Sequence, residues 1–265
     1  MNLVDYHIHT YLCEHASGTP DEYIMRAINS NFIEIGFSDH APLPADLREG
    51  ITMRPEEIEG YINLIEEKKA LYKDKIAIKI GFEVDYPFKA GTGFKKKYLN
   101  DNRIDYLIGS CHFIDDWAFD HPDFLDEFNN RDIDEVYNEY FKIIEGLISN
   151  NFNIIGHFDL IKKFGHRPKG DISKTIENIA KIMSKKNITV EINTSGLRKP
   201  VNEIYPSQKI IDILHNYNIP ITLGSDSHSP DEVGYKFNMA ITMVKKAGYR
   251  KISGFSKRKR YDIIV

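Results

Sequence analysis

The chain has 265 residues, of which 42% are hydrophobic and 28% charged, and its formal net charge is −4. This length and composition are typical of a globular protein and suffice for one large α/β domain or two small ones. They exclude a disordered chain, and the acidic balance argues against a general nucleic-acid surface.

The N-terminus reads "MNLVDYHIHT" and lacks the basic and then apolar pattern of a signal peptide, and no apolar run approaches the length of a membrane span. Two cysteines, Cys13 and Cys111, are too few for a disulfide framework. We therefore expect a cytoplasmic protein without a membrane or nucleic-acid partner. Its oligomeric state is left open.

Short β-rich apolar runs alternate with longer amphipathic stretches along the chain. Strands are predicted at residues 2–6, 34–40, 75–83, 104–112, 152–159, 188–196 and 219–228. Helices are predicted at residues 20–31, 53–72, 132–151, 173–187, 206–218 and 229–248. Strands that alternate with helices imply a parallel sheet, and seven such units favour a closed barrel over an open sheet. We expect a distorted (β/α)7 TIM-like barrel that forms one domain over residues 1–265.

Histidines and acids gather where the predicted strands end. In "DYHIHT", His7 and His9 alternate with Ile8 and therefore point to the same side of a strand. The C-terminal strand ends carry the active site in a parallel barrel. The residues found at these ends or in the loops that follow are His7, His9, His15, Asp39, His40, Glu83, His112, His157, Asp159, Asp226 and His228.

The other three histidines serve as a comparison. His215 lies inside a helical pattern, where an imidazole without a metal role is expected. His121 and His166 fall in predicted loops, from which either can reach a substrate.

The number and type of these side chains indicate more than one metal ion. Seven imidazoles with Glu83 and Asp226 are too many ligands for one tetrahedral zinc, and they offer too few oxygens for calcium. Shared among three divalent ions they fit well. The ligand types suit Zn, Mn or Fe without choosing among them.

The motifs "HIHT", "SDHA", "GFEVD", "GSCHF", "GHFD" and "GSDSH" occur in this order between Asp5 and His228. With them the chain resembles the PHP (polymerase and histidinol phosphatase) family of metal-dependent phosphoesterases. Within the family, "NTSGLRKP" and "FIDDWAFD" are most similar to the members that hydrolyse L-histidinol phosphate in histidine biosynthesis. The resemblance implies a phosphomonoesterase that releases L-histidinol and phosphate.

The resemblance also implies how the ions are shared. One ion is expected on His7, His9, Glu83 and Asp226, a second on Glu83, His112 and His157, and a third on His15, His40 and His228. Glu83 is then the bridging ligand. A water held between two ions is deprotonated near neutral pH and attacks phosphorus in line, while the ions stabilise the developing negative charge.

Candidate substrate-binding residues lie around these ligands. Arg198 follows a strand end, and its guanidinium can hold two phosphate oxygens, although a surface arginine after a turn is the alternative. Lys162 and Lys163 are weaker candidates for the phosphate, because a lysine pair is usually solvated. The loop "FIDDWAFD" carries five candidates for the amine and imidazole of histidinol: Asp115, Asp116, Trp117, Phe119 and Asp120. The alternative is an acidic surface loop pinned by a buried tryptophan.

Asp39 adjoins the expected ligand His40 and is predicted to orient a metal-bound imidazole. Asp159 and Glu191 have weaker claims to the same role. Two functional alternatives stay open: a PHP phosphoesterase or nuclease that acts on another phosphate ester, and a PHP protein that binds metal without catalysis.

Overall fold

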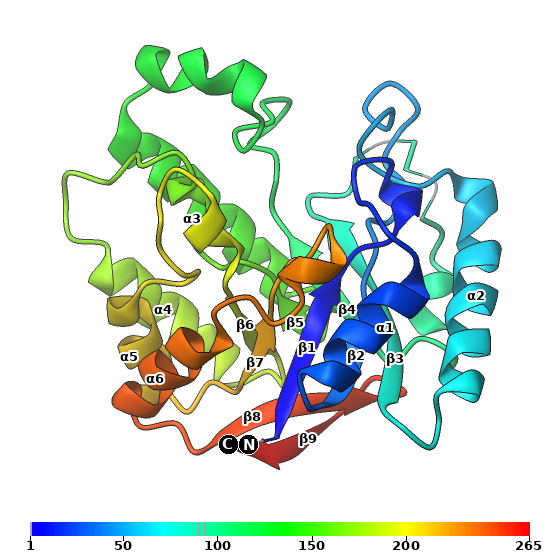
Figure 1. Cartoon of the computed structure of the whole chain (residues 1–265). Helices are drawn as coiled ribbons and strands as arrows, with labels where there is room; N and C mark the ends of the chain where they lie inside the picture. Colours follow the sequence, from blue (N-terminus) through cyan, green and yellow to red (C-terminus); the bar gives the residue numbers. More distant parts are fainter. Residues whose placement is uncertain (1, 90, 93) are drawn as a thin grey trace.

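Seven parallel strands form the centre of the molecule in the computed structural model, which describes residues 2–89, 91–92 and 94–265. Their order in the sheet is the order of the chain, and helices surround them (Figure 1). The strands are β1 Leu3–Ile8, β2 Phe32–Phe37, β3 Ala77–Asp85, β4 Tyr106–Ser110, β5 Ile154–Ile155, β6 Thr189–Asn193 and β7 Ile221–Gly224.

The first and last strands meet, which nearly closes the sheet into a barrel. A parallel bridge joins Ile8 to Ser227, the backbone N–H of His9 donates to the Ser227 carbonyl at 3.0 Å, and the Ser227 N–H donates to the His7 carbonyl at 3.1 Å. The predicted (β/α)7 TIM-like fold is therefore confirmed. Closure brings the histidines of β1 beside the residues that follow β7.

Six helices of the described chain cover the barrel: α1 Pro20–Asn29, α2 Ile58–Leu71, α3 Ile133–Ile148, α4 Ser173–Met183, α5 Gln208–Asn216 and α6 Phe237–Ala247. Each buries an apolar face, as the sequence pattern predicts. The start of α1 shows the local reason: Thr19 and Glu22 form a capping box, and Pro20 occupies the first turn. The last helix begins eight residues later than predicted, because Gly234 and Lys236 adopt positive φ angles.

Aromatic side chains fill the inside of the barrel. The rings of Tyr6 and Tyr106 meet edge to face with 4.9 Å between their centroids, and the Tyr106 hydroxyl donates to the Tyr6 carbonyl. Gly36 and Gly81 leave room for the Tyr106 ring, which a side chain at either position would displace. The interior is thus a packed core, and a ligand can enter at the C-terminal ends of the strands.

A C-terminal hairpin, β8 Lys251–Ser256 and β9 Lys259–Ile264, crosses the barrel at the end opposite the long βα loops (Figure 1). The sequence analysis did not predict it. Its turn contains Arg258, whose guanidinium donates to the carbonyls of Leu99 and Asn151, so this part of the basic run is not simply solvated. The hairpin thus covers the end of the barrel that carries no predicted site residue.

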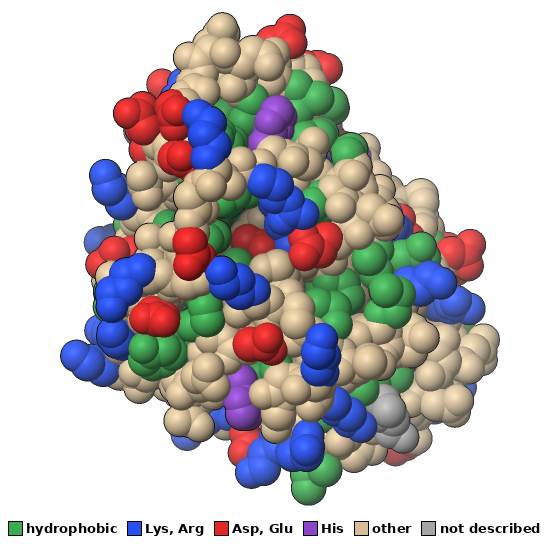
Figure 2. Space-filling view, turned by 90° about the vertical axis from the view of Figure 1, so that its left-hand side faces the viewer, with side chains coloured by type: hydrophobic (Ala, Val, Ile, Leu, Met, Phe, Trp, Pro, Cys, Tyr) green, Lys and Arg blue, Asp and Glu red, His purple; other side chains and the backbone are tan. Residues whose placement is uncertain are grey.

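On the face formed by α3 to α6, basic and acidic side chains are interspersed (Figure 2). Among the residues described, no helix is both long and apolar enough to cross a bilayer.

Candidate metal centre

A cavity of about 490 Å³ opens at the C-terminal ends of the strands, between the βα loops. Six of the seven strands lead into a loop that contributes to its lining, and β3 contributes Glu83 and Asp85 from its own C-terminal end. It therefore occupies the position at which a parallel barrel places its active site.

The structure brings the predicted ligands together. Three groups have ligand atoms within 4.8 Å of one another: His7, His9 and Asp226; Glu83, His112 and His157; His15, His40 and His228. The second and third groups match the ligand sets that the resemblance implies, and the first contains three of the four members of its set, without Glu83. His9 and Glu83 form a further group with His40, and His9 forms another with Cys13 and His228, so the groups are contiguous.

Unpartnered nitrogens show that this donor set fits metal ions. His7 Nε2, both ring nitrogens of His9, His40 Nδ1 and His228 Nε2 are buried and accept or donate no hydrogen bond in the described chain. A buried polar atom without a partner is costly. Divalent ions bound between these rings would satisfy the nitrogens and remove that cost.

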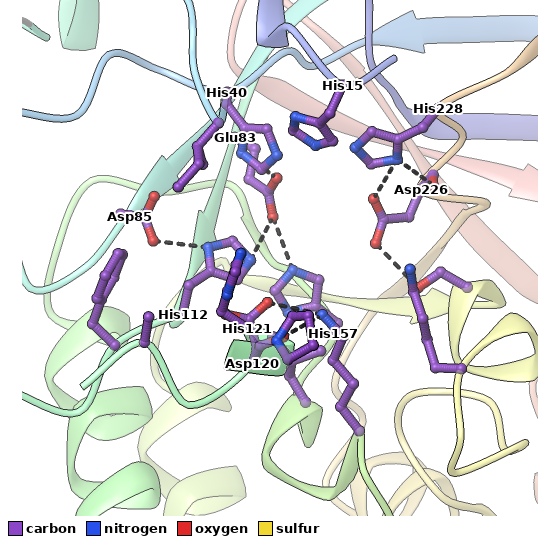
Figure 3. Close-up of a pocket in the computed structure, with 18 of the residues that line it drawn as sticks. His15, His40, Glu83, Asp85, His112, Asp120, His121, His157, Asp226 and His228 are labelled. Carbon is purple, nitrogen blue, oxygen red and sulfur yellow. Dashed lines mark hydrogen bonds and ion pairs between the residues drawn. The ribbon is translucent and has the colours of Figure 1, made fainter. Parts of the chain in front are cut away.

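Glu83 lies at the centre of the cluster (Figure 3). Its carboxylate is 2.8 Å from His157 Nε2, 3.0 Å from His40 Nδ1 and 3.3 Å from His7 Nε2. The two oxygens thus face different histidines. This is the geometry that a carboxylate bridging two ions requires.

Burial and charge act against each other throughout this cluster. Burial opposes protonation of His7, but the carboxylates of Glu191 and Glu83 outweigh it and raise the His7 pKa well above its usual range. Burial also opposes ionisation of Glu83, yet the imidazoles of His7 and His40 hold the pKa of Glu83 well below its usual range. Glu83 therefore stays ionised, and the cluster attracts cations.

His40 and His228 behave in the opposite way. Burial is the largest cause, and with the charge of His9 it lowers the pKa of both rings well below the usual range. Both rings are neutral at physiological pH. A neutral imidazole is the form that binds a metal ion.

Two carboxylates hold the ligand histidines from behind. Glu191 Oε1 lies 2.7 Å from His7 Nδ1, and Asp85 Oδ1 lies 2.8 Å from His112 Nδ1. Such contacts fix the orientation and tautomer of an imidazole ligand. Glu191 was only a weak prediction and Asp85 was not predicted, although Asp85 lies two residues after Glu83 and so shares its side of β3.

Asp39 is buried beside the cluster and contacts backbone N–H groups rather than the ring of His40. It accepts hydrogen bonds from the Thr10 N–H at 3.1 Å and from the His40 N–H at 2.8 Å. Its Oδ1 atom lies 3.7 Å from His9 Nδ1. The imidazole that Asp39 adjoins is therefore that of His9, not that of His40.

Arg198 lines the cavity, as predicted. One of its terminal nitrogens, Nη2, donates to the carbonyls of Ser225 and Asp226 at 2.9 and 3.0 Å, and Nε lies 3.1 Å from Glu232 Oε1. The other, Nη1, is buried without a partner in the described chain. The guanidinium is thus fixed in place, and Nη1 keeps its hydrogen-bonding capacity.

Lys162 is not in the cavity wall, which corrects its prediction as a substrate-binding residue. Its ammonium is buried, lies 2.8 Å from Asp159 and 3.0 Å from Glu203, and donates to the Ile204 carbonyl. The residue that lines the cavity is the next one, Lys163. A one-residue difference in a short 3-10 turn decides which lysine faces the ligand, and the sequence pattern does not resolve it.

The loop after β4 also needs correction. Asp116 is fully exposed and pairs with Lys89, and Trp117 is buried with its Nε1 donating to the Phe124 carbonyl. Neither lines the cavity. Of the five candidates in this loop, Asp120 lines the cavity, together with Phe113, Ala118, His121 and Pro122.

Of the two loop histidines that were predicted to be able to reach a substrate, His121 lines the cavity and His166 does not. His166 stacks on Phe128 with 4.0 Å between ring centroids, and His215 packs against Tyr249. Neither His166 nor His215 lies in the cavity wall.

Comparisons with known proteins agree with this fold and site. Residues 5–195 match the PHP domain. The probable histidinol-phosphatase of Deinococcus radiodurans is 36% identical over 97% of this chain and 98% of its own length. The histidinol-phosphatase of Bacillus subtilis is 28% identical over 89% of this chain and 97% of its own length.

The same architecture occurs in a solved structure. Histidinol phosphate phosphatase from Lactococcus lactis, complexed with zinc, L-histidinol and phosphate, superposes with a TM-score of 0.78 and 24% identity. The alignment covers 98% of this chain and 99% of that one. The chain belongs to the PHP family of metal-dependent phosphoesterases, and its barrel has the fold of that structure.

Proposed function

We propose that the protein is a histidinol-phosphatase that hydrolyses L-histidinol phosphate to L-histidinol and phosphate. The observation that carries the proposal is the cluster formed by Glu83 and the eight other predicted ligands, in a chain that matches a probable histidinol-phosphatase over almost its whole length. The reaction belongs to histidine biosynthesis, so we place the protein in the cytoplasm. We further propose that residues 1–265 act as one catalytic domain.

Three divalent ions are proposed, one in each ligand group, with Glu83 shared between two of them. When bound, they would supply a nucleophilic water at neutral pH and neutralise charge on the phosphoryl oxygens. Zinc is supported by the relative from Lactococcus lactis, whose structure contains it. Histidine and carboxylate ligands also accept Mn and Fe.

Side chains of the protein would position the phosphate and orient the metal ligands. Arg198 faces the cavity with Nη1 free, while its other nitrogens are held by the carbonyls of Ser225 and Asp226 and by Glu232. An arginine fixed in this way donates to a phosphate oxygen without a further loss of side-chain freedom. Glu191 and Asp85 keep the rings of His7 and His112 in one orientation, so the site is rigid before the substrate binds.

Phosphate release by the purified protein tests the proposal. The protein is treated with a chelator, desalted, and reloaded with Zn or Mn. L-Histidinol phosphate and p-nitrophenyl phosphate are then compared. The expected result is metal-dependent release with a higher kcat/KM for L-histidinol phosphate. Release from the aryl ester alone would contradict the substrate, and no release from either ester would favour a metal-binding protein without catalysis.

A further inference from the structure

Five acidic residues line the cavity, and four of them already have a role in the metal cluster or in holding Arg198. Glu83 and Asp226 are in the ligand groups. Asp85 is bonded to His112, and Glu232 holds both the Arg198 side chain and the backbone N–H of His228. Asp120 is the fifth. It is not part of the proposed metal sites, and it does not hold Arg198, the residue proposed to bind the phosphate.

The Asp120 side chain is held in place, but one of its carboxylate oxygens has no hydrogen-bond donor among the described residues. Lys163 Nζ lies 3.1 Å from its Oδ2 atom and donates to its backbone carbonyl at 2.7 Å. In the part of the chain that the structure describes, Oδ1 accepts no hydrogen bond from the protein. The side chain is only 20% exposed, so a cation that binds to Oδ1 would do so in a partly desolvated site.

The surroundings of Asp120 favour an organic substituent over another phosphate. Asp120 and His121 lie next to His112 and His157, across the cavity from His15 and His228 (Figure 3). The cavity wall on this side includes Phe113, Ala118, Pro122 and Leu160, which are apolar. A phosphate held by the cluster and Arg198 would leave the alcohol portion of an ester to face this acidic and apolar wall.

We propose that Asp120 binds the ammonium group of the substrate and thereby selects phosphate monoesters of amino alcohols. This inference rests on the proposed function and deepens it. In L-histidinol phosphate the ammonium is carried by the carbon next to the one that bears the ester oxygen. An ammonium so close to the phosphate lies within reach of a carboxylate beside His157, and the apolar wall accommodates the remaining carbon atoms.

The competing explanation is that Asp120 only orients Lys163 toward the phosphate. The two explanations differ in which substrate suffers when the carboxylate is lost. If Asp120 binds the ammonium, its loss affects only esters that carry one. If Asp120 orients Lys163, its loss affects all phosphate esters alike.

The test uses the metal-loaded enzyme, the Asp120→Asn variant and two esters: L-histidinol phosphate and 3-(imidazol-4-yl)propyl phosphate, which lacks the amine. We expect D120N to lower kcat/KM for L-histidinol phosphate about 10–100-fold, because a charge-assisted hydrogen bond is lost. For the amine-free ester we expect a change within about threefold. Asp126→Asn, on the exposed 3-10 segment η4 Pro122–Asn130, is the matched control and leaves both values unchanged.

Equal losses for both esters would overturn the proposal in favour of the orienting role. The wild-type enzyme provides a second measurement that does not depend on the folding of D120N. It is expected to prefer the amine-bearing ester at least about 10-fold. Equal wild-type activity on the two esters overturns the role of Asp120 and leaves the phosphatase intact, whereas no activity on L-histidinol phosphate overturns the proposed function itself.

Discussion

Glu191 lies directly behind His7, with its Oε1 atom 2.7 Å from His7 Nδ1, and its other oxygen accepts the backbone N–H of His157 at 2.8 Å. One buried carboxylate thus supports residues from two of the proposed metal groups. Glu191→Gln keeps the size of the side chain but removes the charge. We expect metal affinity to fall about 10–100-fold, measured by competition with a chromogenic chelator.

Activity should return when E191Q is assayed with excess metal, because the residue acts through His7 and does not touch the substrate. Activity that stays low at saturating metal would show that Glu191 has another role. Unchanged metal affinity would show that the contact with His7 is not functional.

Arg198 offers one free N–H group to the cavity while its other nitrogens are held. Arg198→Lys keeps the positive charge but loses the planar arrangement that fixes the donor. We expect kcat/KM for L-histidinol phosphate to fall about 10–100-fold while bound metal is unchanged. Steady-state kinetics and metal analysis on the same sample test this, and a variant with wild-type kinetics would remove Arg198 from the phosphate site.

At the residue scale, strand-end histidines were predictable and their supporting residues were less so. His7, His9 and Glu83 stand out because chemistry-bearing residues at successive strand ends converge in a parallel barrel. Asp85 was missed because its role depends on which ring its carboxylate meets across a strand pair. The sequence pattern could not show which of Lys162 and Lys163 lines the cavity, because neighbouring side chains of a 3-10 turn point in very different directions.

The short 3-10 element η5 Leu160–Lys162 carries a buried ion cluster that joins two loops. Lys162 is 1% exposed and contacts Asp159, Glu203 and the Ile204 carbonyl. Lys162→Met removes the cation and leaves the buried Asp159 carboxylate uncompensated. We expect a loss of about 3–5 kcal/mol in the free energy of unfolding, measured by urea denaturation.

Lys209→Met is the matched control, because Lys209 pairs with Asp171 on the surface and both side chains are mostly exposed. Its expected effect is within about 1 kcal/mol. A similarly small effect of K162M would show that the buried cluster contributes nothing specific to stability.

At the element scale, the alternation of strands and helices was predictable, and several boundaries were not. All seven strands of the barrel appear where the β-rich runs predict them. The start of α6 was placed too early, because Gly234 and Lys236 break the pattern through backbone conformation that Ser229 and Pro230 did not reveal. The hairpin β8–β9 was missed because small residues separate the two buried apolar side chains of β8, charged residues begin β9, and the strands pair only with each other.

For the whole molecule, metal binding is expected to be coupled to pH and to stability. In the metal-free protein, burial opposes protonation of His7 and His9, but Glu191 and Glu83 at His7 and Asp226 and Asp39 at His9 raise both pKa values well above the usual range. These rings therefore carry protons at neutral pH, and an ion must displace them. Metal affinity accordingly rises as pH increases and falls as pH decreases.

Thermal unfolding measures this coupling. An ion present at about 1,000 times its Kd stabilises the folded chain by about 4 kcal/mol, so Mn or Zn should raise Tm by several degrees over the chelated protein. The increase should be larger at pH 8 than at pH 6. An increase that is equal at both pH values would contradict the displacement of protons, and no increase at either would contradict the metal cluster.

The central claim is that the ions around Glu83 carry out the hydrolysis of L-histidinol phosphate. Its most direct test titrates the chelated enzyme with Zn or Mn and follows phosphate release from L-histidinol phosphate together with bound metal, for the wild type and for Glu83→Gln. We predict that wild-type activity rises with bound metal to a plateau, while E83Q retains less metal and loses activity about 1,000-fold or more. Wild-type activity that persists without metal, or an E83Q variant with normal metal content and turnover, would contradict the account.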